Sequence, residues 1–178
     1  MNIFESGQVV NIPEVLANKD ERVALQNQLA LANKNWSVIG AKLNIPGPVK
    51  NNELIRRFFI EQIREFTSNA DFELELKADW SDKVTGPEFF YLAKAKPSEV
   101  KKSCVAFEES TKARRLFDLD VHYFDNGEIK DLSRRQLKLP GRTCLICGNN
   151  AKVCARARTH TVDELQSKVC TLICDELF

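Results

Sequence analysis

The sequence has no apolar run approaching the roughly 20 residues that span a bilayer. Its first residues, MNIFESGQVVNIPE, lack the basic and apolar regions of a secretory signal. Low-complexity tracts are absent too. Hydrophobic residues make up 43% of the chain and charged residues 29%, which is typical of a folded chain rather than a disordered one. These absences argue against a membrane-spanning, secreted or disordered protein and predict a folded, cytoplasmic one.

The six cysteines are expected to stay reduced in such a compartment, where thiols bind metal or pack in a core more often than they form disulfides. Three of them share the stretch RTCLICGNNAKVCARARTH (142–160) with a histidine, in the order Cys144, Cys147, Cys154 and His160. A Cys-x-x-Cys pair followed by Cys and His supplies four ligands, enough for a closed tetrahedral zinc site. The same pattern is compatible with a small core of reduced cysteines, with a redox pair at Cys144 and Cys147, or with a substrate loop that works through its arginines.

The net charge of +1 hides an uneven distribution. Residues 112–160 carry eleven Lys and Arg against five Asp and Glu, so this block is basic while the rest of the chain is acidic. The block holds seven arginines: Arg114, Arg115, Arg134, Arg135, Arg142, Arg156 and Arg158. The planar guanidinium group matches phosphate oxygens, so the block predicts a phosphate-binding surface, although solvated charged faces are also common.

The hydrophobic pattern predicts alternating strands and helices. FELELKA (72–78) alternates apolar and charged residues, which is typical of a strand with one solvated face in an antiparallel sheet. Residues 51–66 place apolar side chains at the three-four spacing of a helix that buries one face, with Asn51 or Asn52 as its cap. From residue 36 the predicted order is strand, helix, strand, strand, helix, strand, at 36–45, 51–66, 72–78, 88–95, from Pro97 onward, and 116–124.

Two split βαβ units in this order predict an α+β fold, with an antiparallel sheet that carries helices on one face in the ferredoxin-like, nucleotidyltransferase-type plan. One or two helices at 13–33 precede the sheet, a tight turn is expected at Asp125-Asn126-Gly127, and helices at 131–139 and 162–177 flank the cysteine-bearing loop. The chain is expected to form a single domain, 1–178, with a catalytic core at 36–130 and a C-terminal Cys/His and helical appendage at 131–178.

The stretch RRLFDLDVHYF (114–124) places two aspartates in an apolar run. Because strand side chains alternate, Asp118, Asp120 and His122 project from the face opposite the apolar side chains. Two carboxylates spaced in this way can share Mg²⁺, which takes oxygen ligands, keeps sites for substrate phosphates and assists nucleotidyl transfer. The alternative is a pair of solvated surface charges. A third carboxylate is expected in such sites, and spacing does not choose among Glu73, Glu75, Glu88 and Glu109.

Four motifs make the sequence resemble one enzyme family. NIPGPVK (44–50), TGPE (85–88), RLFDLDV (115–121) and the cysteine stretch at 142–160 occur in the order and spacing of apo-citrate lyase phosphoribosyl-dephospho-CoA transferases, the holo-acyl-carrier-protein synthases of citrate lyase. The resemblance implies transfer of the phosphoribosyl-dephospho-CoA prosthetic group from 2′-(5″-triphosphoribosyl)-3′-dephospho-CoA to a serine of the citrate lyase acyl-carrier (gamma) subunit. Pyrophosphate would be released.

The resemblance also implies roles for individual residues. Asp118 and Asp120 would be catalytic and ligate Mg²⁺ or Mn²⁺, and Arg115 would contact the triphosphate. The remaining substrate-binding residues would be Asn44, Gly47, Lys50, Arg134, Arg142 and Arg156. The cysteines and histidine of the 142–160 stretch match the family pattern, which leaves open whether they bind Zn²⁺.

One position departs from the family pattern. A glycine is expected before the RLFD motif, and Arg114 stands there instead. Glycine lets a backbone approach a phosphate closely, whereas arginine adds a side-chain contact or blocks the approach.

A rival hypothesis is a zinc-stabilised basic module that binds RNA or a protein partner. It rests on the Cys/His cluster and the arginines. RNA-binding sheets generally expose aromatic side chains for stacking, whereas the face that carries Asp118 and Asp120 is acidic, so a nucleic-acid partner is not favoured.

Overall fold

A five-stranded sheet forms the centre of the computed structural model, which describes residues 2–178. Neighbouring strands all pair antiparallel, in the order β2-β3-β1-β4-β5. The strands are β1 (Ser37–Leu43), β2 (Leu74–Asp79), β3 (Glu88–Ala93), β4 (Phe117–Asp125) and β5 (Glu128–Asp131). The helices are α1 (Ile12–Ala32), α2 (Glu53–Ser68), α3 (Pro97–Ser110), α4 (Ala151–Ala157) and α5 (Val162–Leu177), with short 3-10 helices η1 (Ile3–Glu5) and η2 (Arg114–Leu116). The predicted α+β class with an antiparallel sheet is confirmed, and β5 is additional to the predicted strands.

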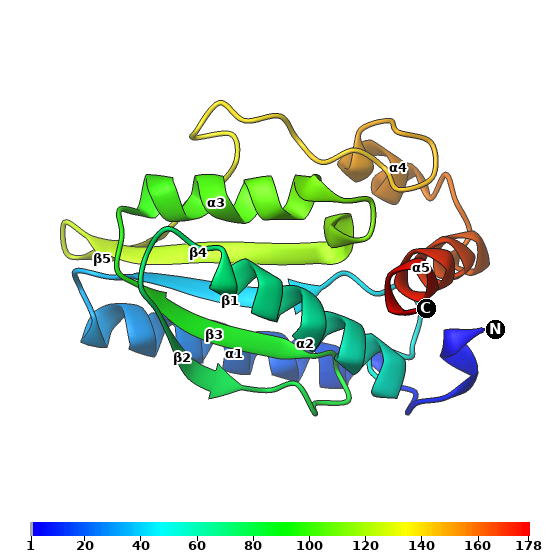
Figure 1. Cartoon of the computed structure of the whole chain (residues 1–178). Coiled ribbons are helices and arrows are strands. Elements are labelled where there is room, and N and C mark those ends of the chain that lie inside the picture. The colour runs from blue at the N-terminus through cyan, green and yellow to red at the C-terminus, as the bar shows by residue number, and fades with distance from the viewer. Residues whose placement is uncertain (1) are drawn as a thin grey trace.

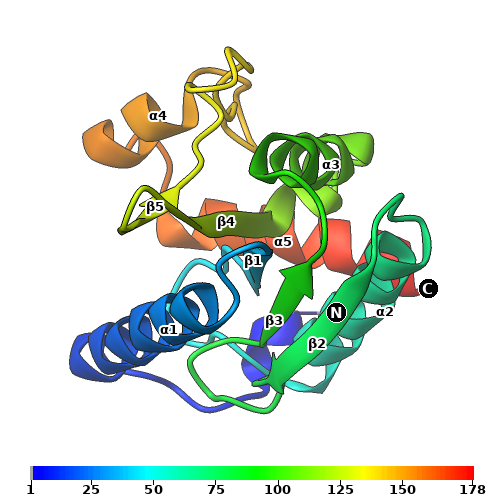
Figure 2. The same ribbon diagram turned by 90° about the vertical axis from the view of Figure 1, so that its left-hand side faces the viewer.

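Helices cover both faces of the sheet (Figures 1 and 2). On one face α2, α3 and α5 enclose the main core, whose buried side chains include Phe58, Phe59, Phe117 and Ile173. On the other face α1 packs against β1, where a Cβ on Gly40 would stand 2.3 Å from the side-chain nitrogen of Gln26. The expected plan with helices on one face holds for α2 and α3, whereas α1 adds a cover on the face that carries the aspartates.

Capping residues fix where the helices begin. Asn11 and Glu14 form a capping box at α1, and Thr161 and Glu164 form another at α5. Of the two cap candidates for α2, Asn52 is the cap, since its side-chain oxygen accepts from the backbone N–H of Ile55 at 2.9 Å.

The predicted tight turn joins β4 to β5. Asn126 and Gly127 both have positive φ, 50° and 87°, and they lie between the paired residues Asp125 and Glu128. Two-residue hairpin turns with positive φ at both positions match the twist of the strands, which is why the Asn-Gly pair predicts the hairpin.

The helix predicted at 131–139 is wrong. Asp131 is the last residue of β5, and the chain then makes a turn in which the Leu139 N–H donates to the Arg134 carbonyl at 2.9 Å. Lys138 has a φ of 56°, in the left-handed region, and Pro140 disfavours helical backbone at the residue before it. A right-handed helix therefore does not form there.

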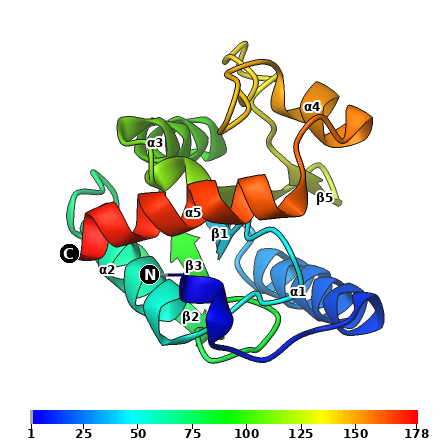
Figure 3. The same ribbon diagram turned by 90° about the vertical axis from the view of Figure 1, so that its right-hand side faces the viewer.

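The predicted helix at 162–177 is confirmed as α5. Val169 and Ile173 of α5 are buried in the main core, and α5 lies against α2 and η1 (Figure 3). The division of one domain into 36–130 and 131–178 stays a prediction. Within residues 2–178, no helix combines the length and the apolar character needed to cross a membrane.

Candidate active site

The two aspartates of β4 meet a lysine of β1. Asp118 and Asp120 project from the same side of β4, and the residues that alternate with them are buried on the other side, as predicted. Lys42 lies opposite Asp118 in the antiparallel register. Its Nζ donates to Asp118 Oδ2 at 2.5 Å and to Asp120 Oδ2 at 2.8 Å. Two carboxylate oxygens therefore converge on one cationic atom.

This cluster shifts the acid–base behaviour of its members. Burial lowers the pKa of Lys42, but Asp120 and Asp118 together raise that pKa above its ordinary value. Burial raises the pKa of Asp118, but Lys42 and Arg142 outweigh it and hold that pKa below its ordinary value. Both groups are therefore charged at neutral pH.

Replacing Lys42 by Met is expected to raise the pKa of Asp118, because Lys42 is the strongest influence that lowers it. A carboxylate with a lowered native pKa contributes stability above its unfolded pKa, about 3.9, and loses that contribution as pH falls through the native value. Lys42→Met should therefore be less stable than the wild type at pH 7 and should lose less stability on acidification. NMR titration of the aspartate carboxyl carbons and urea unfolding at several pH values measure both effects.

Lys130→Met is the matched control, because Lys130 pairs with Asp125 at the exposed hairpin. It should leave the Asp118 titration unchanged. An Asp118 pKa that is the same in Lys42→Met and in the wild type would contradict the assignment of Lys42 as its partner.

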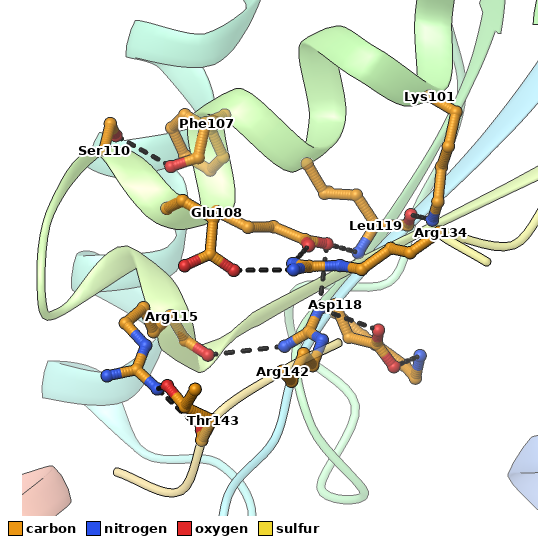
Figure 4. A network of polar contacts seen from close by, with 12 residues as sticks. Lys101, Phe107, Glu108, Ser110, Arg115, Asp118, Leu119, Arg134, Arg142 and Thr143 are labelled. Carbon is orange, nitrogen blue, oxygen red and sulfur yellow. Dashed lines mark hydrogen bonds and ion pairs between the residues drawn. The ribbon is translucent and has the colours of Figure 1, made fainter. Parts of the chain in front are cut away.

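A buried glutamate of α3 organises the other side of the aspartates (Figure 4). The side chain of Glu108 is 1% exposed, and its carboxylate accepts from the Leu119 N–H at 2.7 Å. Leu119 lies in the part of β4 before the residues that pair with β5. Glu108 also pairs with Arg134 and, at 2.9 Å, with Arg142. Arg142 continues to Asp118 Oδ1 at 3.0 Å. One arginine thus connects the buried glutamate to the aspartate pair.

A cavity of about 910 Å³ lies beside this network. Its basic side chains come from α1, the sheet and the loops around it: Arg22, Lys42, Lys50, Arg115, Arg142 and Arg158. Its apolar lining includes side chains of the cysteine loop and of α5: Leu145, Val162, Leu165 and Val169. Cations and an apolar wall in one large cavity suit an organic ligand that carries phosphate groups.

The predicted substrate-binding residues fall into two groups. Those that line the cavity are Asn44, Lys50, Arg115 and Arg142. Gly47, Arg134 and Arg156 are not among its lining residues: Arg134 is held by Glu108 and Glu109, and Arg156 is exposed on α4. The aspartate pair adjoins the cavity through two residues that do line it, Lys42 and Arg142.

Three residues of the site were not predicted. Lys42 had a signal in the sequence, because it is the one charged residue in the apolar strand at 36–45. Glu108 had a weaker one, since it follows the apolar Val100 and Cys104 at four-residue spacing on α3. Arg22 is one of many charged residues of α1, and no feature of the sequence distinguished it from the others.

Glu88 is the best placed of the four candidates for a third carboxylate. It lies opposite Lys42 on β3, so that Glu88, Lys42 and Asp118 form a row across the sheet. Its carboxylate pairs with Arg22 at 2.8 Å and accepts from Asn18 at 2.6 Å. The other candidates pair with lysines or an arginine outside this row, Glu73 with Lys94, Glu75 with Lys77 and Glu109 with Arg134.

The arginine at the expected glycine position turns towards α2 and α3. Arg114 donates from Nε to Gln62 at 2.7 Å, pairs with Glu65, and stacks over Phe107 at 4.8 Å. Its neighbour Arg115 lines the cavity instead. Arg114 therefore anchors η2 to α2 and α3, and the expected effect of this arginine on a phosphate stays a prediction.

Gly47 shapes the loop before α2. Its φ is 80°, and a Cβ there would stand 2.3 Å from Nε2 of Gln166, which donates to the Pro46 carbonyl at 3.2 Å. Gly47→Ala is expected to destabilise the fold by about 1–2 kcal/mol, because a side chain is strained at this φ and displaces Gln166. Gly141→Ala is the control, since its φ is not positive and its Cβ would meet only Asn150 at 4.0 Å. Equal midpoints of urea unfolding for the two variants would contradict this prediction.

The Cys/His group gathers at one wall of the cavity. Cys147 Sγ lies 3.5 Å from Cys154 Sγ and 3.3 Å from His160 Nε2. The ligand atoms of these three residues and of Cys144 all lie within 4.8 Å of one another. Hydrogen bonds with the Asn149 backbone, His160 and Cys154 lower the pKa of Cys147 to about 6. The four residues that the sequence grouped are therefore together in space.

The fold and the site define a class of protein. An antiparallel sheet that carries a carboxylate pair beside a large basic cavity suits a transferase that acts on a phosphorylated substrate. Comparison with known proteins then identifies the family. Residues 10–176 match the family of apo-citrate lyase phosphoribosyl-dephospho-CoA transferases (CitX), and the chain belongs to this family.

Curated relatives agree with the family match. The chain is 33% identical over 175 residues to the apo-citrate lyase phosphoribosyl-dephospho-CoA transferase of Escherichia coli O1:K1 / APEC, covering 97% of this chain and 93% of the relative. It is 31% identical over 175 residues to a probable transferase of the same name from Streptococcus pyogenes serotype M18, covering 96% and 88%. Protein CitXG of Leuconostoc mesenteroides subsp. cremoris is 34% identical over 170 residues. The aligned region covers 95% of this chain but 36% of that longer protein. The chain is thus an enzyme of the transferase class.

Proposed function

We propose that this enzyme transfers the phosphoribosyl-dephospho-CoA group from 2′-(5″-triphosphoribosyl)-3′-dephospho-CoA to a serine of the citrate lyase acyl-carrier (gamma) subunit. The serine oxygen forms a bond to the phosphorus nearest the ribose and gives up its proton, while the bond from that phosphorus to the outer two phosphates breaks and pyrophosphate leaves. The names of the family and of its members support this reaction. The observation in this chain that carries it is the aspartate pair joined through Arg142 to a large basic cavity.

The aspartate pair fits Mg²⁺ or Mn²⁺. The donor set consists of oxygens, and one oxygen of each aspartate already converges on a single cationic atom, at 2.5 and 2.8 Å. When bound, the metal supplies neutralisation of phosphate charge at the reacting phosphorus. Lys42 holds the two carboxylates together, and these two carboxylates would hold the metal.

The arginines of the cavity are held in place by protein groups. The Arg142 guanidinium is fixed by Glu108 and Asp118, and that of Arg115 donates to the Thr143 carbonyl at 2.6 Å. Such prior positioning reduces the reorganisation needed when a charged substrate binds. We assign Arg115 and Arg142 to the donor's phosphates.

Lys50 belongs to the same binding surface. Burial lowers its pKa, and its Nζ donates to the Ile45 carbonyl at 2.6 Å. We assign Lys50 and Asn44, the cavity residues of this loop, to substrate contact. Gly47 shapes the loop, Arg134 positions Glu108, and Arg156 stays a prediction from the family pattern.

We further infer the ferredoxin-like, nucleotidyltransferase-type plan for residues 36–125. Two observations support it: the strand order β2-β3-β1-β4, and the placement of the crossover helices α2 and α3 on the same face. In this plan the two crossovers each skip one strand, which makes every neighbouring pair antiparallel.

The rival hypothesis of a basic module for RNA or a protein partner gains no support from the comparisons, because the close relatives carry transferase names. The face with the aspartates packs against α1, and Lys42 pairs there with both aspartates. The cytoplasmic location and the lack of a membrane or nucleic-acid partner stay predictions.

Intact-mass spectrometry of the carrier subunit tests the proposal. Incubation of apo-carrier with the donor, Mg²⁺ and this enzyme should add the mass of one prosthetic group, and pyrophosphate should appear in equal amount. A carrier with its acceptor serine replaced by alanine should stay unmodified. If the E. coli relative modifies the carrier under the same conditions and this folded enzyme does not, the proposed function is wrong.

A further inference from the structure

We propose that Cys144, Cys147, Cys154 and His160 bind one Zn²⁺ ion, and that this ion fixes the arginine-bearing wall of the cavity. The ligand atoms lie within 4.8 Å of one another. Zinc with thiolate bonds of about 2.3 Å and nitrogen bonds of about 2.0 Å in tetrahedral geometry places its ligand atoms about 3.5–3.8 Å apart. The observed contacts of 3.3 and 3.5 Å around Cys147 are close to that spacing.

The local backbone is built to bring these residues together. Residues 143–150 form a tight loop closed by an antiparallel bridge between Thr143 and Asn150. Within it the Gly148 N–H donates to the Cys144 carbonyl at 3.2 Å, and Gly148 has a φ of 75° that suits glycine. This turn presents the Cys-x-x-Cys pair on one side, as in a zinc knuckle.

The second pair of ligands comes from α4 and the residues after it. Asn150 caps α4 through its side-chain oxygen, which sets Cys154 one turn into the helix. Arg158 then adopts the left-handed conformation, with φ of 49° and ψ of 44°, and the Thr159 N–H donates to the Cys154 carbonyl at 3.1 Å. This reversal brings His160 back to Cys147. The left-handed backbone of Arg158, which is unfavourable for a non-glycine residue, thus lies at the reversal that brings His160 next to Cys147.

The other interpretations of the cysteines account for less. A reduced core leaves Cys147 unexplained, because that thiol is exposed and His160 is only half-buried. A disulfide uses two sulfurs and gives no role to the third cysteine or to the histidine. Zinc uses all four groups.

The proposed ion is connected to the cavity through the residues beside its ligands. Cys144, Cys154 and His160 themselves line the cavity. Thr143, next to Cys144, holds the Arg115 guanidinium, and Arg142 and Arg158 each lie two residues before a ligand. Because a closed tetrahedral site fixes its ligands relative to one another, zinc would hold these three arginines in one arrangement. This second step rests on the proposed function, whereas zinc binding itself does not.

Metal analysis of the full-length protein, purified with a thiol reductant, tests the site. About one zinc per chain is expected, and Co²⁺ replacing it should give the visible absorption of a tetrahedral thiolate site. Cys147→Ser should lose the metal, and Cys174→Ser, a thiol on α5 outside the cluster, should keep it. A wild-type protein with free thiols that takes up no zinc, or Cys147→Ser that keeps full stoichiometry, would overturn the site.

Calorimetric binding of inorganic triphosphate tests the connection to the cavity. Affinity should fall at least about tenfold in Cys147→Ser relative to Cys174→Ser, as expected when the support of binding groups is removed. Equal affinity in the two variants would overturn the connection. Because metal content is measured without the carrier or the donor, failure of the zinc site and failure of the proposed transfer are distinguishable.

Discussion

Asp118→Asn is expected to slow transfer to the carrier subunit by about 10²–10³-fold at saturating Mg²⁺. Asparagine keeps the size of the side chain and can still accept from Lys42, but it removes one of the two negative charges that converge on a single cation. Loss of one charged ligand from the site of phosphoryl chemistry costs about 3–4 kcal/mol of transition-state stabilisation, and each tenfold in rate is about 1.4 kcal/mol. The rate is measured by intact mass of the carrier over time.

The control for Asp118→Asn is Asp125→Asn on the same strand. Asp125 pairs with Lys130 at 2.6 Å at the hairpin, and its side chain is 43% exposed. Its variant should transfer at nearly the wild-type rate. Thermal unfolding of both variants separates lost chemistry from lost folding. A wild-type rate in a folded Asp118→Asn would remove the aspartate pair from the mechanism.

The sequence predicted those features of the fold that depend on neighbouring residues. The alternation in β4 placed Asp118 and Asp120 on one side, and the spacing in α2 identified its buried face, because both depend on the period of a single element. The Asn126-Gly127 turn was also predicted, since its positive φ angles demand those residue types.

The features that the sequence did not predict depend on contacts between residues that are distant in the chain. A turn at 134–138 replaces the predicted helix. Arg134 in this turn pairs with Glu108, 26 residues earlier in the chain. Lys42 is separated from Asp118 by 76 residues, and only the strand order brings them together. Arg114 stands where the family pattern has a glycine, and its side chain donates to Gln62 of α2, 52 residues earlier in the chain. The sequence shows which side chains are charged, whereas the tertiary fold determines which oppositely charged or polar group each of them contacts.

Glu108→Gln is expected to lower the free energy of unfolding by about 3 kcal/mol. The glutamate is 1% exposed and neutralises two arginines, Arg134 and Arg142. Glutamine still accepts from the Leu119 N–H, so the edge of β4 keeps its hydrogen bond, but the arginines lose their buried charge partner. Removing one member of a buried ion pair typically costs 3–5 kcal/mol, and the lower end applies because the Arg142 side chain is 27% exposed and keeps Asp118.

Glu109→Gln is the matched control, because Glu109 is adjacent on α3 and pairs with the same Arg134 at 2.6 Å, but its side chain is 45% exposed. Exposed pairs contribute about 0–1 kcal/mol, so urea unfolding should separate the two variants by at least about 2 kcal/mol. The two substitutions remove the same charge one residue apart, so the variants differ in the burial of that charge and in the number of arginines that it neutralises. If both variants unfold at the same urea concentration, Glu108 is not the residue that holds the arginines. If only Glu108→Gln is destabilised, the buried carboxylate of Glu108 positions Arg142 beside Asp118 without touching the substrate. The transfer activity of Glu108→Gln should then fall together with its stability.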